Sequence, residues 1–152
     1  MKGLAGWPAR FFKKMESPED LYYSPEHEWL RIDGQNVFIG LTGFAASALG
    51  DIIFVDIMGL GKLIPRGGVY GTVEAVKTVY DLIMPATGRL LEINPALSAC
   101  PGLINQAPCG LGWIARIALN NDEELQGLMN GKEYAEWTGR FRRLFNQSTH
   151  VR

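Results

Sequence analysis

The 152-residue chain has room for one domain of ordinary size, and its hydrophobic fraction of 47% can build a core without disulfide bonds. Residues 1–15 and 140–152 together carry eight basic residues and no acid, so the body between them, with seven basic residues against sixteen acids, has a formal charge of −9. The acidic body disfavours nucleic-acid binding and favours basic protein partners. No apolar run approaches the ~20 residues of a membrane span.

The first fifteen residues and the cysteine count bear on location. The N-terminal segment is basic, but its apolar residues are scattered rather than gathered into the hydrophobic centre of a secretory signal. The two cysteines, without an export signal, indicate a reducing compartment and no disulfide framework. We therefore expect a cytoplasmic protein, with a mitochondrial location as the alternative.

The first half of the chain is predicted to form a hairpin, a short helix and a further strand. In order, these elements are strands at 22–31 and 37–41, a helix at 43–49 and a strand at 51–57. Asp33-Gly34 is typical of a hairpin turn, Thr42 suits the N-cap of the helix, and Gly50 suits its end in a left-handed conformation. Alternation predicts three apolar residues on one face of the last strand: Ile53, Val55 and Ile57.

The second half is predicted to alternate strands with short helices. It comprises a strand, tip and strand over 69–84, a strand at 90–93, an irregular helix at 95–106, a strand at 113–119, and helices at 122–129 and 132–145. Pro85 and Gly88 turn the chain between the first two of these segments, and Asn94 and Asn121 are suitable helix caps. The expected fold is mainly β with short peripheral helices. We assign residues 21–137 to the domain, 1–20 to a basic extension and 138–152 to a basic tail.

The segment around Lys77 carries the strongest chemical signal. Val76 and Thr78, which are stiff at χ1, flank the lysine, with Glu74 three residues before it and Asp81 four residues after it. Such neighbours hold the backbone in place and leave a long amine free, as enzymatic attachment of a group requires. A lysine between two strands is by itself most often a solubilising edge residue, so the surrounding pattern has to decide.

That pattern resembles a known family. Residues 74–81, Glu-Ala-Val-Lys-Thr-Val-Tyr-Asp, are similar to the Glu-Ser-Val-Lys-Ala-Val-Ser-Asp type of motif around the lipoylated lysine of glycine cleavage H-proteins, with departures at Ala75, Thr78 and Tyr80. The opening Tyr-Ser-Pro-Glu-His-Glu-Trp at 23–29 resembles the His-Glu-Trp signature of the same family. Further matches follow in order at 39–42, 49–55, 84–88, 93–97 and, as Gly-Leu-Gly-Trp, at 110–113. The resemblance covers about residues 21–137.

The resemblance implies a barrel-sandwich hybrid of the lipoyl and biotinyl carrier type. It implies a non-catalytic carrier, with lipoic acid attached covalently to Lys77, that shuttles an aminomethyl intermediate between the enzymes of glycine cleavage. The implied partners are a lipoate-attaching ligase or transferase, a pyridoxal phosphate glycine decarboxylase, a folate-dependent aminomethyltransferase and dihydrolipoyl dehydrogenase. Four residues are the expected recognition elements of the tip: Glu74, Val76, Thr78 and Asp81.

Glu28 lies in the His-Glu-Trp signature. We assign it to sheltering the cationic aminomethyl group by a charge-assisted hydrogen bond. The alternative is a solvated carboxylate at a strand edge. A metal site assembled from imidazoles is excluded by the histidine count, since the sequence has His27 and His150 only, so we expect His27 to be structural.

Two features depart from the family. Cys100 and Cys109 stand where H-proteins usually have polar residues and a tyrosine, and they are either small packed thiols or thiols that exchange with the arm. The basic ends also contain aromatic residues, which fit amphipathic helices or partner docking. Both features resemble those of divergent H-like lipoate-binding proteins of sulfur oxidation. That resemblance implies an alternative function, in which the arm carries sulfur intermediates for a heterodisulfide-reductase-like complex.

Three other classes of function are less favoured. Biotinyl domains usually flank their lysine with methionines, whereas Val76 and Thr78 stand here. A scaffold that had lost its modification would show a damaged tip, but Lys77 and Glu74 are intact. An enzyme is disfavoured because no segment brings together a nucleophile, a base and an orienting group.

Overall fold

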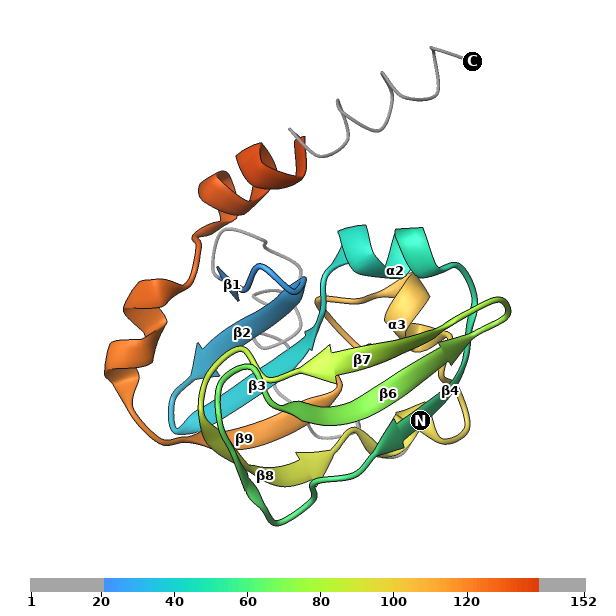
Figure 1. Ribbon diagram of the computed structural model, residues 1–152. Coiled ribbons are helices and arrows are strands. Elements are labelled where there is room, and N and C mark those ends of the chain that lie inside the picture. The colour runs from blue at the N-terminus through green and yellow to red at the C-terminus, as the bar shows by residue number, and fades with distance from the viewer. Residues whose placement is uncertain (1–20, 140–152) are drawn as a thin grey trace.

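The computed structural model describes residues 21–139, which form two antiparallel sheets with short helices around them (Figure 1). The larger sheet has the order β1 (Tyr22–Tyr23), β2 (Glu28–Asp33), β3 (Asn36–Leu41), β9 (Ala115–Leu119), β8 (Gly88–Ile93), β5 (Leu63–Ile64). The smaller sheet has the order β4 (Ile52–Ile57), β6 (Val69–Ala75), β7 (Val79–Ile83). The prediction of a mainly β fold with short peripheral helices is confirmed.

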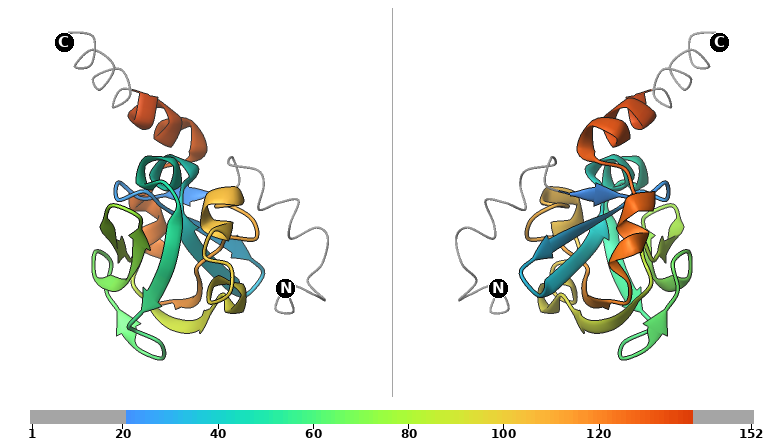
Figure 2. Two further views of the ribbon diagram at one scale, coloured as in Figure 1. Left: turned by 90° about the vertical axis from the view of Figure 1, so that its right-hand side faces the viewer. Right: turned by 90° about the vertical axis from the view of Figure 1, so that its left-hand side faces the viewer.

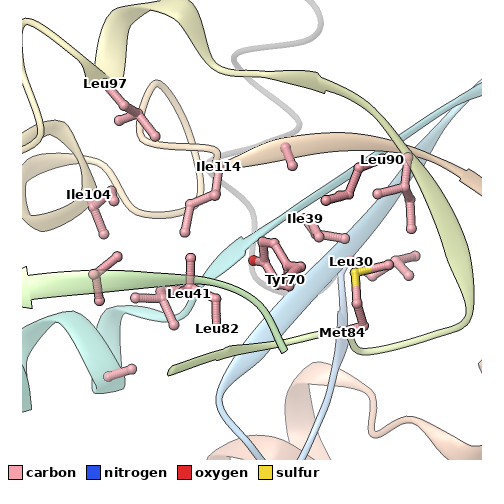
Figure 3. Close-up of a cluster of buried hydrophobic side chains, with 14 of the residues drawn as sticks. Leu30, Ile39, Leu41, Tyr70, Leu82, Met84, Leu90, Leu97, Ile104 and Ile114 are labelled. Atoms are coloured by element: carbon pink, nitrogen blue, oxygen red, sulfur yellow. The ribbon is translucent and has the colours of Figure 1, made fainter. Parts of the chain in front are cut away.

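The core lies between the two sheets, because both contribute alternate apolar side chains to it. Leu30 and Ile39 come from the larger sheet and Tyr70 and Leu82 from the smaller one, and all four are fully buried (Figure 3). A buried side chain of this size contributes about 1.5–3 kcal/mol relative to an exposed one. The burial of alternate residues on each strand therefore fixes which face of the β6–β7 hairpin looks inward.

The predicted first hairpin and helix are confirmed. Gly34 has a φ of 63° in the turn between β2 and β3. Helix α2 (Gly43–Leu49) begins at Thr42, whose hydroxyl accepts a hydrogen bond from the Ala45 N–H, and ends at Gly50, which has a φ of 78°. The positive φ agrees with the prediction, although the ψ of −160° places Gly50 outside the left-handed helical region.

The predicted face of the 51–57 strand is wrong in one residue. The register of β4 against β6 shifts between Ile52 and Phe54, which is a β-bulge. Ile52 is consequently 3% exposed and Ile53 54% exposed, while Val55 and Ile57 pack on the core as expected.

Two predicted helices are shorter and tighter than expected. The 95–106 segment divides into a 3-10 turn, η3 (Pro95–Leu97), and a single α-helical turn, α3 (Leu103–Gln106). The predicted helix at 122–129 is a 3-10 helix, η4 (Asp122–Gly127), although Asn94 and Asn121 cap η3 and η4 as predicted. The helix predicted at 132–145 begins at residue 131 and is described to residue 139. The rest of its predicted range lies outside the described residues, as do residues 1–20 and 140–152 of the basic ends.

A second apolar cluster lies on the opposite face of the larger sheet. The indole of Trp29 lies against Gly40 of the neighbouring strand, where an added Cβ would meet the ring at 2.7 Å. Tyr134, from the helix of residues 131–139, stacks on Tyr23 with ring centroids 4.5 Å apart. Figure 2 shows this helix next to α2, at the opposite end of the domain from β8.

Candidate functional site

Lys77 lies in the loop of residues 76–78 that joins β6 to β7. Glu74 and Val79 form the last registered pair of the hairpin, and the Ala75 N–H donates to the Thr78 carbonyl at 2.8 Å. Val73 and Ala75 are buried, whereas residues 76–79 are all exposed, so the hairpin leaves the core after Ala75. The tip therefore projects from the body of the domain and carries Lys77 into solvent (Figure 1).

The four residues predicted to identify the tip are brought together around Lys77. Glu74, Val76, Thr78 and Asp81 are all exposed. In the register of the hairpin Glu74 pairs with Val79 and Thr72 pairs with Asp81, so the two carboxylates share the outer face of the small sheet. Their role in recognition stays a prediction.

Lys77 fits covalent attachment of an acyl group. Within the described part of the chain its amine has no ion pair and no hydrogen bond, and the side chain is exposed at a fixed turn. An amide bond to such an amine needs no rearrangement of the domain and removes one positive charge.

Glu28 is fully buried, so the alternative of a solvated strand-edge carboxylate is wrong. Its two carboxylate oxygens accept hydrogen bonds from the Tyr70 hydroxyl at 2.8 Å and 3.0 Å. Burial raises the pKa of the Glu28 carboxyl well above its ordinary value, although the hydrogen bonds from Tyr70 and from the backbone of Ile83 act in the opposite direction. The contact joins β2 of the large sheet to β6 of the small one.

Sequence reasoning missed Tyr70 and the role of Tyr80. Tyr80 is half-buried on β7, and its hydroxyl donates to the backbone carbonyl of Glu26 at 2.9 Å. Burial raises the pKa of Tyr80, and the negative charges of Glu28 and Glu26 raise it further. The bond to the Glu26 carbonyl attaches the Tyr80 ring to the backbone two residues before Glu28. The departure of Tyr80 from the serine of the resembling motif was the signal that could have identified it.

His27 takes part in a series of polar contacts. Its Nδ1 lies 2.8 Å from the Tyr134 hydroxyl, which lies 2.7 Å from the Thr42 hydroxyl. The φ of His27 is 65°, and burial lowers its pKa. This agrees with the structural role predicted for His27, and residues 21–139 contain no group of ligands that could hold a metal ion.

The two cysteines differ in environment, and both are free thiols. Cys100 is exposed, whereas Cys109 packs on the cluster around Trp29 and Trp113. Burial raises the pKa of Cys109 to about 11, although the positive charge of Arg31 and a backbone hydrogen bond from Gly43 lower it. The interpretation as a small packed thiol therefore fits Cys109 and does not fit Cys100. The raised pKa disfavours thiol exchange at Cys109.

Comparisons with known proteins show which family the chain is similar to. A model of the family described as glycine cleavage H-protein matches residues 21–140. The chain is 44% identical over 121 residues to the glycine cleavage system H protein of Symbiobacterium thermophilum, covering 80% of this chain and 94% of that protein. It is likewise 44% identical over 124 residues to that of Salinibacter ruber, covering 82% of this chain and 100% of the relative.

A solved structure is also similar. The crystal structure of a glycine cleavage system H protein from Mycobacterium marinum superposes with a TM-score of 0.72 at 35% sequence identity, over 81% of this chain and 99% of the other. In residues 21–139 no helix is long and apolar enough to cross a membrane.

Proposed function

This chain belongs to the glycine cleavage H-protein family, and we propose that it is a lipoyl carrier that shuttles an aminomethyl group between the enzymes of glycine cleavage. The expected barrel-sandwich fold of lipoyl carriers is confirmed by the two-sheet architecture and by the likeness to a solved family member. The one observation that carries the proposal is the position of Lys77, exposed at the tip of a hairpin whose base is buried.

Attachment of the cofactor uses the Lys77 amine as the nucleophile. The nitrogen bonds to the carbonyl carbon of an activated lipoyl donor, the bond from that carbon to its leaving group breaks, and one proton leaves the nitrogen. The buried anchors Val73 and Leu82 hold both strands of the hairpin, so the amine is presented at a constant position. Lipoic acid would supply a redox-active disulfide on a long flexible arm, and the chain itself supplies position and shelter.

We propose Glu28 as the group that shelters the cationic load of the arm. A buried carboxylate would bind a cation strongly once it is deprotonated, since the surrounding medium screens charge poorly. In the present arrangement Tyr70 occupies both oxygens and the nearby Tyr80 is bonded to Glu26. Binding of a cation by Glu28 would therefore need the Tyr70 hydroxyl to release at least one carboxylate oxygen.

The proposed partners are those of glycine cleavage: the lipoate-attaching enzyme, the decarboxylase, the aminomethyltransferase and the dehydrogenase. The alternative, transport of sulfur intermediates, has no support among the relatives compared above, which are glycine cleavage system H proteins by name. Its thiol-exchange element is disfavoured at Cys109 by the raised pKa. Mass spectrometry of the Lys77 peptide after reaction with lipoate, ATP and a lipoate ligase tests the proposal.

A further inference from the structure

The outer face of the small sheet is apolar and acidic next to the tip. In the register of β4, β6 and β7, Phe54 pairs with Glu74 and Glu74 with Val79, so these three side chains form a row across the sheet. The row behind it is Asp56, Thr72 and Asp81. We call these six residues the tip face. Its two apolar members are well exposed, Phe54 by 55% and Val79 by 60%.

The β-bulge in β4 enlarges this apolar surface. Because the register shifts between Ile52 and Phe54, Ile52 stays in the core while Ile53 and Phe54 are exposed in succession. Val76, in the loop beside Lys77, is 70% exposed. Exposed apolar side chains are ordinary when they are scattered, but here Phe54 and Val79 lie in one row on either side of Glu74, next to the loop that carries Lys77, which is typical of an interaction site. Bulges are also frequent next to functional sites, where they redirect side chains.

The charge of the tip face has one sign. Asp56, Glu74 and Asp81 are exposed, and no Lys or Arg belongs to the six residues. Among residues 21–139 the other cations lie elsewhere: Arg31, Lys62, Arg66, Arg89, Arg116 and Lys132. Acylation of Lys77 removes the positive charge of the loop that adjoins this face. A partner for this face therefore needs an apolar groove flanked by Lys or Arg side chains.

We propose that the tip face is the docking surface for the enzyme that acylates Lys77, with Phe54 as its apolar anchor. The inference rests on the proposed function, since the partner it names is the enzyme that recognises Lys77 before the lipoyl group is attached. It extends recognition beyond the hairpin to a residue of the neighbouring strand, more than twenty positions earlier in the sequence.

The attachment reaction itself indicates which partner binds this face. An acylating enzyme has to bring the carbonyl carbon of its activated donor into bonding contact with the Lys77 nitrogen, so its surface must cover the tip and the rows beneath it. An enzyme that acts on the far end of a completed arm works at the length of that arm and has no need of the same rows. An acylating enzyme that covers the tip and this face would therefore contact Phe54 and Glu74 during the attachment step.

Acceptor kinetics test the inference. The full unlipoylated chain is reacted with lipoate, ATP and a purified lipoate ligase, and kcat and KM for the protein acceptor are measured by intact mass. Phe54→Ala should lower kcat/KM about tenfold, mainly through KM, as truncation of an interface anchor does. Leu63→Ala, which shortens a 51% exposed side chain in β5 of the other sheet, is the matched control and should stay within twofold of the parent chain.

A charge variant and a chemical control complete the test. Asp56→Asn with Asp81→Asn should raise KM and weaken its dependence on salt, because exposed charges that steer association are screened by ions. A small acylating reagent such as acetic anhydride should modify Lys77 equally fast in the parent and in Phe54→Ala, since the amine itself is unchanged. Equal melting temperatures would exclude misfolding as the cause.

The outcomes separate the inference from the function on which it rests. Unchanged kcat/KM in Phe54→Ala, with the parent chain lipoylated at Lys77, overturns the docking surface and leaves the carrier function standing. Normal attachment with slower decarboxylation would likewise overturn it, in favour of a later enzyme. A parent chain that is never acylated overturns both. A dimer that Phe54→Ala dissociates without changing attachment would assign the face to a second copy of the chain and also contradict the inference.

Discussion

The Tyr70 hydroxyl lies 2.8 Å and 3.0 Å from the two carboxylate oxygens of Glu28, a buried contact between a strand of each sheet. Glu28 is 0% exposed, and so is Tyr70. The hydrogen bond from Tyr70 stabilises the charged form of this carboxyl group, whereas the absence of water destabilises it. The charge state of Glu28 therefore depends on how completely the surrounding groups exclude water from it.

Tyr70→Phe should destabilise the fold by about 1–3 kcal/mol, because the buried Glu28 carboxyl loses its one side-chain donor among the described residues and keeps only the backbone bond from Ile83. The pKa of Glu28 should rise further, since the bond from Tyr70 lowers it. Urea unfolding measures the first effect. Tyr22→Phe, at an exposed tyrosine on β1, is the control and should be close to neutral.

Stability should depend on pH through Glu28. The folded state holds this proton to a higher pH than the unfolded chain, whose carboxyl has the ordinary value of 4.5. The stabilisation is fully present below that unfolded pKa and is lost as pH rises through the raised folded pKa. Glu28→Gln, which mimics the protonated form, should remove this dependence from a series of urea titrations. An unchanged pH profile in Glu28→Gln would contradict the assignment.

Tyr80→Ser should lower the pKa of Glu28, because it removes a half-buried ring that is bonded to the backbone two residues before Glu28 and so admits water. Tyr80→Phe keeps the ring and loses the bond to the Glu26 carbonyl, so it should leave the pKa of Glu28 raised. Carbon NMR of the Glu28 carboxyl in unlipoylated protein distinguishes the two variants. Equal shifts in both would show that burial by Tyr80 is not the cause.

The two thiols should differ in reactivity. At neutral pH little of Cys109 is thiolate, since its pKa is raised to about 11, and the side chain is packed. Iodoacetamide should therefore label the exposed Cys100 first, by a wide margin, as peptide mass spectrometry can follow. Labelling of Cys109 at the rate of Cys100 would instead support the hypothesis that Cys109 exchanges with the arm.

The hairpin and its lysine could be predicted from the sequence because their determinants are local. The alternation of buried residues in β6 and β7 and the turn at 76–78 lie within one continuous segment. The caps at Thr42 and Asn94 were equally local. The family pattern around Lys77 then added the chemistry.

The rest depended on contacts between distant segments. The bulge at Ile53 is decided by how β4 registers on β6, which sequence alternation does not reveal. The burial of Glu28 depends on Tyr70, 42 positions away. The 3-10 helix η4 is joined to a distant segment by tertiary bonds, among them one from the Thr87 N–H to the carboxylate of Glu124. Local propensity contains none of this information.

The carrier function is tested most directly by the mass of the protein after reaction with lipoate, ATP and a lipoate ligase. We predict addition of one lipoyl group, found on Lys77 in the peptide map, with no addition to Lys77→Arg. The variant should unfold like the parent chain, since its side chain lies in solvent at the tip. A Lys77 that stays unmodified with several ligases, or that accepts biotin instead, would contradict the assignment of this chain as a lipoyl carrier.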